Sequence, residues 1–94
     1  MLNDGTEAIL NFVLYPVIGE KNLTQAATFL ISTHVVPNLS EGNLNKEKLL
    51  AGLQDAILKT GWKSECGATA MIEDTEESIK LLLKTIMVHV QTNP

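Results

Sequence analysis

The chain has 94 residues, with seven lysines, no arginine and eleven acidic residues, which gives a net charge of −4 at neutral pH. Nucleic-acid affinity comes largely from Lys and Arg that neutralise phosphates, and these lysines are scattered, so we expect binding neither to nucleic acid nor to an anionic membrane. A chain of this length predicts one domain, residues 1–94, and its scarcity of aromatic residues favours an aliphatic core between packed helices.

The single cysteine, Cys66, excludes an intramolecular disulfide and is typical of a protein from a reducing compartment. No apolar run reaches the length of about 20 residues that spans a bilayer. The N-terminal segment lacks the layout of a secretory signal, because no Lys or Arg precedes its apolar run. We therefore expect a cytoplasmic protein.

The first predicted helix begins at Asp4, where Glu7, three residues later, completes a capping box, and it runs to Leu14. Pro16 is expected to end it, because proline has no N–H and disfavours helical geometry in the residue before it. Gly19 then supplies a turn.

The second predicted helix begins after Asn22, whose side chain can accept a hydrogen bond from the helix start, and Pro37 is expected to stop it. The β-branched residues between positions 28 and 36 leave a strand as a real alternative, since the period of a short apolar run does not decide between the two.

The third predicted helix is capped by Asn45, and a leucine on either side of the cap has the spacing of a hydrophobic staple. At its end, Gly61 can take the left-handed conformation, and Trp62 can then fold back on the helix as the hydrophobic contact of a Schellman motif. The connection that follows is the least determined part of the chain, and residues 68–72 could form a short strand or a single turn.

The last predicted helix is capped by Asp74, with Glu77 completing a second capping box. Six apolar residues then share one face at helical spacing: Ile79, Leu82, Leu83, Ile86, Met87 and Val90. Leu81 and Val88 lie off that face, one heptad apart, while Lys80, Lys84, Thr85, His89 and Gln91 are left to meet water. A helix with two apolar faces needs either two neighbours in its own chain or a second copy.

We expect the second copy to be the partner, because three other short helices would not enclose the last one fully. The predicted interface consists of Leu81, Lys84, Met87 and Val88. The alternative is that the last helix is central in the monomer and buries both faces there.

No motif in the chain carries recognisable chemistry. Cys66 has neither His34 nor His89 near it in sequence, so the pattern predicts neither an activated thiolate nor a zinc site. The acidic run from Glu73 to Glu77 is explained by the start of a helix, where negative side chains are stabilised by the macrodipole. We expect no catalytic residue, cofactor or metal.

The predicted fold is all-α, a single-domain bundle of about four short helices that is dimeric. Residues 42–53, Gly-Asn-Leu-Asn-Lys-Glu-Lys-Leu-Leu-Ala-Gly-Leu, followed by a polar break and an amphipathic last helix, resemble the YmgB/AriR-type small biofilm-development regulators of enteric bacteria. The resemblance covers the second half of the chain. It implies an all-helical homodimer that acts by binding other regulatory proteins.

Two functions follow as hypotheses. The first is a non-catalytic regulator or adaptor that dimerises and acts by binding an unidentified protein. The second is a small-ligand-binding protein or a minor enzyme, with a pocket between helices or at the dimer interface near Trp62 and Cys66. A flat exposed stripe at Leu81 and Val88 favours the first, and clustering of Cys66 with a histidine around an open cavity favours the second.

Overall fold

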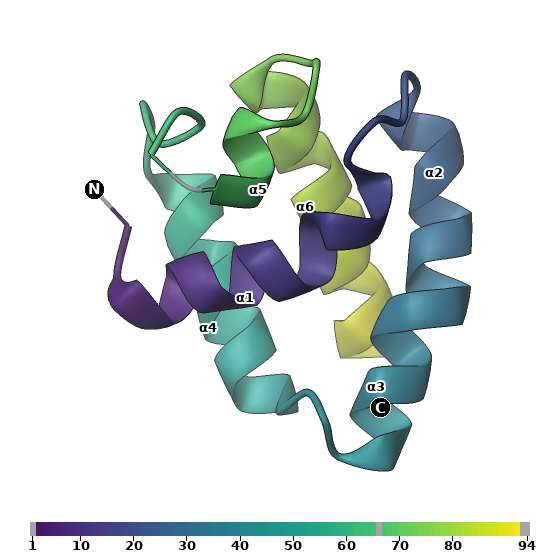
Figure 1. The fold of residues 1–94 in the computed structure, drawn as a ribbon. Helices are drawn as coiled ribbons and strands as arrows, with labels where there is room; N and C mark the ends of the chain where they lie inside the picture. Colours follow the sequence, from purple (N-terminus) through teal and green to yellow (C-terminus); the bar gives the residue numbers. More distant parts are fainter. Residues whose placement is uncertain (1, 66, 93–94) are drawn as a thin grey trace.

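The computed structural model describes residues 2–65 and 67–92, and in these residues it contains helices and turns but no strand (Figure 1). The predicted all-α single domain is confirmed. Its elements are α1 (Asp4–Leu14), the 3₁₀ turn η1 (Tyr15–Val17), α2 (Leu23–Leu30), the π-helical turn η2 (Ile31–Val35), α3 (Val36–Glu41), α4 (Lys46–Leu58), α5 (Gly67–Ala70) and α6 (Glu76–Thr92).

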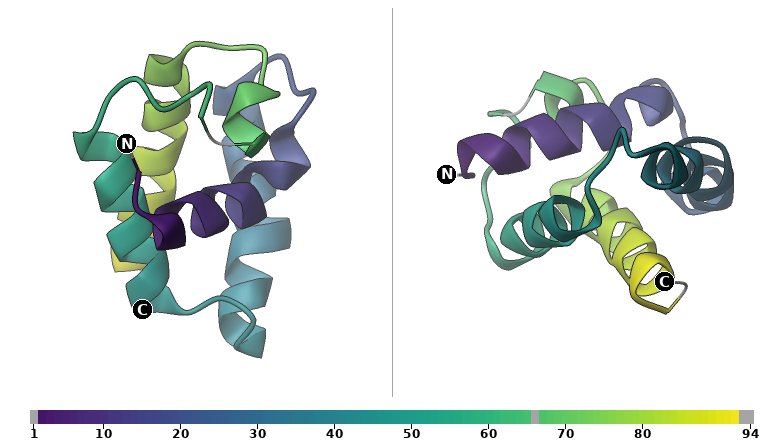
Figure 2. Two further views of the ribbon diagram at one scale, coloured as in Figure 1. Left: turned by 60° about the vertical axis from the view of Figure 1, so that its left-hand side comes forward. Right: turned by 90° about the horizontal axis from the view of Figure 1, so that it is seen from below.

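The helices do not all run side by side. α4 and α6 pack against each other in opposite directions, and α2 packs along the other side of α6. α1 lies crosswise over α4 and also contacts α5 (Figure 1). Seen from below, α1 and α6 occupy opposite sides of the molecule (Figure 2). The core between them is aliphatic, apart from one buried tryptophan, as the composition predicts.

Two of the predicted helix starts are confirmed by their caps. The Asn22 side chain accepts a hydrogen bond from the Gln25 N–H at 3.1 Å, and α2 begins at the next residue. The Asn45 side chain accepts from the Lys48 N–H at 3.0 Å at the start of α4. Both caps depend only on residues within one helical turn, so a local sequence pattern is sufficient to find them.

α1 begins at Asp4 as predicted, but the capping box is wrong. The cap residue is Asn3, and its side chain makes no capping hydrogen bond. The start of α1 instead rests on Asp55 of α4, whose Oδ2 accepts hydrogen bonds from the Asn3 N–H at 3.2 Å and from the Thr6 hydroxyl at 2.8 Å. A carboxylate from another helix thus supplies the acceptor that the local sequence was expected to provide.

The crossing of α1 over α4 depends on Gly52. A glycine inside a helix costs about 1 kcal/mol relative to alanine. Here the missing side chain makes room for Ile9 of α1, since a Cβ at position 52 would lie 3.1 Å from Cγ2 and 3.2 Å from Cβ of Ile9. The close approach of the two helices therefore explains the unfavourable residue.

Pro16 ends α1 as predicted and leaves one carbonyl without its usual helical partner. In a continuous helix the Phe12 carbonyl would accept from the N–H of residue 16, which proline lacks. His34 of η2 occupies this position, with its Nε2 2.7 Å from the Phe12 oxygen. The two rings also stack, with centroids 4.8 Å apart. Because a carbonyl only accepts, Nε2 carries the proton.

The predicted stop at Pro37 is wrong, as is the strand alternative for the same segment. The chain stays helical through α2, η2 and α3, and it ends at Gly42, which has a φ of +82°. Proline inside an α-helix clashes with the carbonyl four residues before it. The turn before Pro37 is widened, because the Val36 N–H bonds to the carbonyl of Ile31, five residues back. This π-turn lets the helix continue past the proline.

Candidate functional site

The candidate site is the outer face of α6. The residues that α6 buries against the core show which of its residues belong to that outer face. Of the six residues predicted to face the core, five are buried and Met87 is half-buried against the core. The helical period predicted this face correctly. The remaining sector of α6 is therefore turned away from α4 and α2.

Leu81 and Val88 lie in that outward sector, with 63 % and 59 % of their surfaces exposed. Lys84 is exposed between them, whereas Met87 lies at the edge of the sector and already packs against the core. Three of the four predicted interface residues therefore point to solvent in the single chain. Leu81 and Val88 are stacked one heptad apart, which makes a narrow apolar stripe two turns long.

Two threonines extend this stripe in a way that the sequence reading missed. The Thr85 hydroxyl donates to the Leu81 carbonyl at 2.9 Å, and the Thr92 hydroxyl donates to the Val88 carbonyl at 2.8 Å. Both hydroxyl protons are thus used within the helix. Thr85 is exposed, as predicted. Because its hydroxyl proton is already hydrogen-bonded within α6, another helix could cover Thr85 without leaving that donor unpaired. A threonine four residues after each apolar residue was the available signal.

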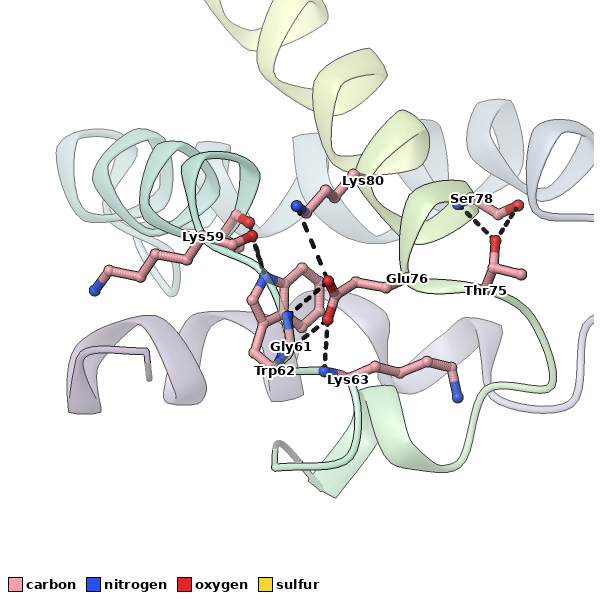
Figure 3. Close-up of polar contacts among 9 residues, drawn as sticks. Lys59, Gly61, Trp62, Lys63, Thr75, Glu76, Ser78 and Lys80 are labelled. Carbon is pink, nitrogen blue, oxygen red and sulfur yellow. Dashed lines mark hydrogen bonds and ion pairs between the residues drawn. The ribbon is translucent and has the colours of Figure 1, made fainter.

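The start of α6 differs from the prediction by one residue. Thr75, not Asp74, is the cap, because its hydroxyl oxygen accepts from the Ser78 N–H at 3.1 Å (Figure 3). Asp74 accepts from the Thr75 N–H at 2.7 Å and stays outside the helix. The later start makes Glu76 the first helical residue and directs its side chain to the loop that follows α4.

The Glu76 carboxylate holds three consecutive backbone N–H groups of that loop (Figure 3). Oε2 accepts from Gly61 at 2.9 Å, and Oε1 accepts from Trp62 at 2.7 Å and from Lys63 at 2.9 Å. Burial by itself would raise the pKa of Glu76, but the three N–H donors and the Lys80 ammonium outweigh it and lower the pKa. The position of α6 is therefore fixed at its first residue.

Lys80 was expected to meet water, and this expectation is wrong. It is 7 % exposed, and its Nζ lies 4.0 Å from Oε2 of Glu76 in an ion pair one turn along α6. Glu76 contacts the loop after α4, and a partner four residues later on α6 lies on the same side of the helix, so Lys80 is turned towards the protein.

Trp62 is a helix-end anchor as predicted, but the Schellman motif is wrong. α4 ends at Leu58, and the cap residue Lys59 is extended with a ψ of 161°. The Trp62 side chain is fully buried, and its indole N–H donates to the carbonyls of Ala56 at 2.9 Å and Lys59 at 3.0 Å. Gly61 does take the left-handed conformation, with a φ of +79°. The indole thus caps the end of α4 from within the core.

The predicted cluster of Cys66 with a histidine falls outside the described residues, because Cys66 is not among them. Of the other residues proposed for a pocket or enzyme, Trp62 is enclosed in the core, His34 is hydrogen-bonded to α1, and His89 lines a pocket at the end of α6. Across residues 2–65 and 67–92, no three His, Cys, Asp or Glu side chains are grouped as metal ligands. None of the helices in the same ranges is both long and apolar enough to cross a membrane.

A second exposed apolar surface lies near α1 and was not predicted. It includes Tyr15, which is 74 % exposed, and Met71, which is 63 % exposed. A groove of about 650 Å³ runs between η1 and α5, with Tyr15 and Met71 among its lining residues. Phe29 of α2 is also exposed, at 68 %, but does not line the same groove. Tyr15 directly follows α1, whereas Leu81 and Val88 belong to α6, and these two helices lie on opposite sides of the molecule (Figure 2).

Comparisons with models of protein families, with curated protein sequences and with solved structures give no match. The resemblance to the YmgB/AriR-type regulators therefore stays a prediction.

Proposed function

We propose that this protein is a non-catalytic cytoplasmic regulator or adaptor that forms a homodimer through the outer face of α6 and acts by binding another protein. The observation that carries the proposal is the exposed pair Leu81 and Val88 on a helix whose inner face is already satisfied. Large exposed apolar patches on soluble proteins mark interaction sites, and Leu81 and Val88 supply the apolar part of such a patch. A second copy is the simplest occupant, because one short stripe can cover another by two-fold symmetry.

The expected strength of this dimer follows from the apolar area that it would bury. Full burial of a Leu or Val side chain contributes about 1.5–3 kcal/mol, and a symmetric contact buries four such side chains that are each roughly 60 % exposed. The gain is then about 4–7 kcal/mol, against an association cost of about 4 kcal/mol or more. Leu81 and Val88 alone thus leave at most about 3 kcal/mol, which is a Kd of roughly 6 mM. Contacts from Thr85, Met87 and their neighbours must add about 3 kcal/mol to give the dissociation that we expect, at tens to hundreds of micromolar.

Sedimentation equilibrium between about 5 and 500 μM tests the proposal. The unchanged protein should show a monomer–dimer equilibrium in this range. The double variant Leu81→Lys/Val88→Lys should be monomeric throughout, because a dimer would bury unpaired ammonium groups. Its circular dichroism should be unchanged, since both side chains are exposed in the single chain.

Leu58→Lys is the matched control. Leu58 is 74 % exposed at the end of α4, so this variant removes an equally exposed leucine from another helix. It should dimerise as the unchanged protein does. A monomeric unchanged protein at the highest concentration, or equal dissociation of both variants, contradicts an interface on α6.

A further inference from the structure

A pocket of about 380 Å³ lies between α3, the start of α4 and the end of α6. Its volume is within the range of small-molecule sites. Four of its seven lining residues are aliphatic, namely Val36, Leu39, Leu44 and Val90, and the others are Ser40, Lys46 and His89. Leu44 and Val90 are almost fully buried, so they belong to the wall that the core supports.

The described residues that line this pocket include one ammonium group, that of Lys46, and no acidic side chain, in a chain whose net charge is −4. Lys46 belongs to neither of the two ion pairs that join described residues, which are Lys59 with Asp55 and Lys80 with Glu76. An exposed ammonium beside an apolar hollow is complementary to a ligand that has an anionic head and an apolar body.

We propose that this pocket binds a small anionic amphiphile, namely a carboxylic acid with a short alkyl or aryl tail. The tail lies against Leu39, Leu44 and Val90, and the carboxylate pairs with the Lys46 ammonium. The head group alone is not sufficient for binding, because a surface charge pair is weak in water. The tail alone is not sufficient for selectivity, because an aliphatic wall does not distinguish between head groups. The proposal does not depend on dimerisation through α6.

A titration of the ¹⁵N-labelled full chain with three matched probes tests this inference: octanoate, octanol and octylammonium. The probes share one tail and differ in the charge of the head. At pH 7 and low salt, octanoate should shift the backbone amides around Leu39, Leu44 and Val90, with a Kd at least fivefold lower than that of octanol. Octylammonium should bind more weakly than octanol, because its charge repels Lys46.

The variant Lys46→Gln should raise the Kd of octanoate about fivefold, to the level of octanol, and leave the Kd of octanol unchanged. Lys48→Gln is the matched control, since Lys48 is an exposed lysine of the same helix that does not line this pocket. It should change neither affinity. Three outcomes overturn the inference: equal Kd values for the three probes, unchanged octanoate binding in Lys46→Gln, and octanoate shifts confined to the groove at Tyr15 and Met71.

Discussion

Asp55 and Glu76 hold the fold together with the same chemical group in two different ways. Their side chains are similarly covered, with 13 % and 17 % of their surfaces exposed, and each pairs with a lysine four residues later on its own helix. Each also fastens a distant segment, which is the start of α1 for Asp55 and the loop after α4 for Glu76.

The difference lies in the donors. Asp55 holds the Lys59 ammonium, the exposed Asn3 N–H and the hydroxyl of Thr6. The first two can turn to water if the carboxylate is lost, which leaves only one buried donor, since Thr6 is 4 % exposed. Glu76 holds three successive backbone N–H groups, two of them in part-buried contacts, and a backbone group cannot rotate away as a side chain does. An unpaired buried donor costs about 1–3 kcal/mol. We therefore expect the donors left behind, and not the similar burial, to decide how much each carboxylate stabilises the fold.

The largest effect is therefore expected for Glu76→Gln. The amide offers one acceptor oxygen in place of two, so it leaves at least one of the three N–H groups unpaired. We expect a loss of about 2–3 kcal/mol in the free energy of unfolding, measured by urea denaturation. Glu77→Gln, at the exposed neighbouring position, should change it by less than about 0.5 kcal/mol. Equal losses in both variants would mean that the loop contacts do not stabilise the fold.

Asp55→Asn should have a smaller effect, a loss of about 1 kcal/mol by the same measurement. The amide oxygen can still accept from Thr6, while the ion pair with Lys59 is a helix-surface pair that contributes little. A loss larger than that of Glu76→Gln would reverse the comparison and show that the crossing of α1 is the more sensitive junction.

Acid should weaken both junctions, because both pKa values are lowered by folding. The Lys59 ammonium and the Thr6 hydroxyl lower the pKa of Asp55 from 3.8 to about 2. The unfolded chain then binds the proton more tightly than the folded one, so the contribution of Asp55 is complete above about pH 4 and is lost as the pH falls towards 2. Unfolding measured between pH 5 and 2 should show this loss, and Asp55→Asn should flatten it. An unchanged slope would contradict the role assigned to Asp55.

Gly52→Ala tests the same junction without a change in charge. Alanine improves the helix by about 1 kcal/mol, but its Cβ would lie 3.2 Å from Cβ of Ile9, an atom close to the backbone of α1. Overpacking of this kind costs about 1–3 kcal/mol, so we expect a net loss of roughly 0.5–1 kcal/mol. Gly5→Ala, where a Cβ meets nothing within 4 Å, should stabilise the protein or leave it unchanged. A stabilised Gly52→Ala would mean that α1 moves easily over α4.

The sequence predicted the features that depend on one helical turn. The caps at Asn22 and Asn45 and the inner face of α6 need no knowledge of the rest of the chain, and neither does the exposure of Leu81. By contrast, the partners of Asp55 and Glu76 come from segments that only the fold brings near. From the sequence alone, nothing distinguishes Asp55 and Glu76 from solvent-exposed acidic residues of a helix.

Two further errors have the same origin. Pro37 was predicted to stop the helix because proline is excluded from the interior of a regular α-helix. That rule does not apply after the wider π-turn of η2, which accommodates the proline ring. Trp62 was assigned a local Schellman contact, whereas its indole reaches two carbonyls at the end of α4. For the candidate site, the helical period predicts the outward stripe, but it carries no information on what covers that stripe.

The hydrogen bond between His34 and the Phe12 carbonyl couples the energetic effect of residue 34 to that of residue 16. With proline at position 16, the imidazole N–H fills a place that no backbone group can take. With alanine at position 16, a backbone N–H competes for the same carbonyl, and the histidine becomes dispensable there. His34→Leu should therefore be more costly in the native chain than in Pro16→Ala, so the tolerance of one site to substitution is set by the residue at the other.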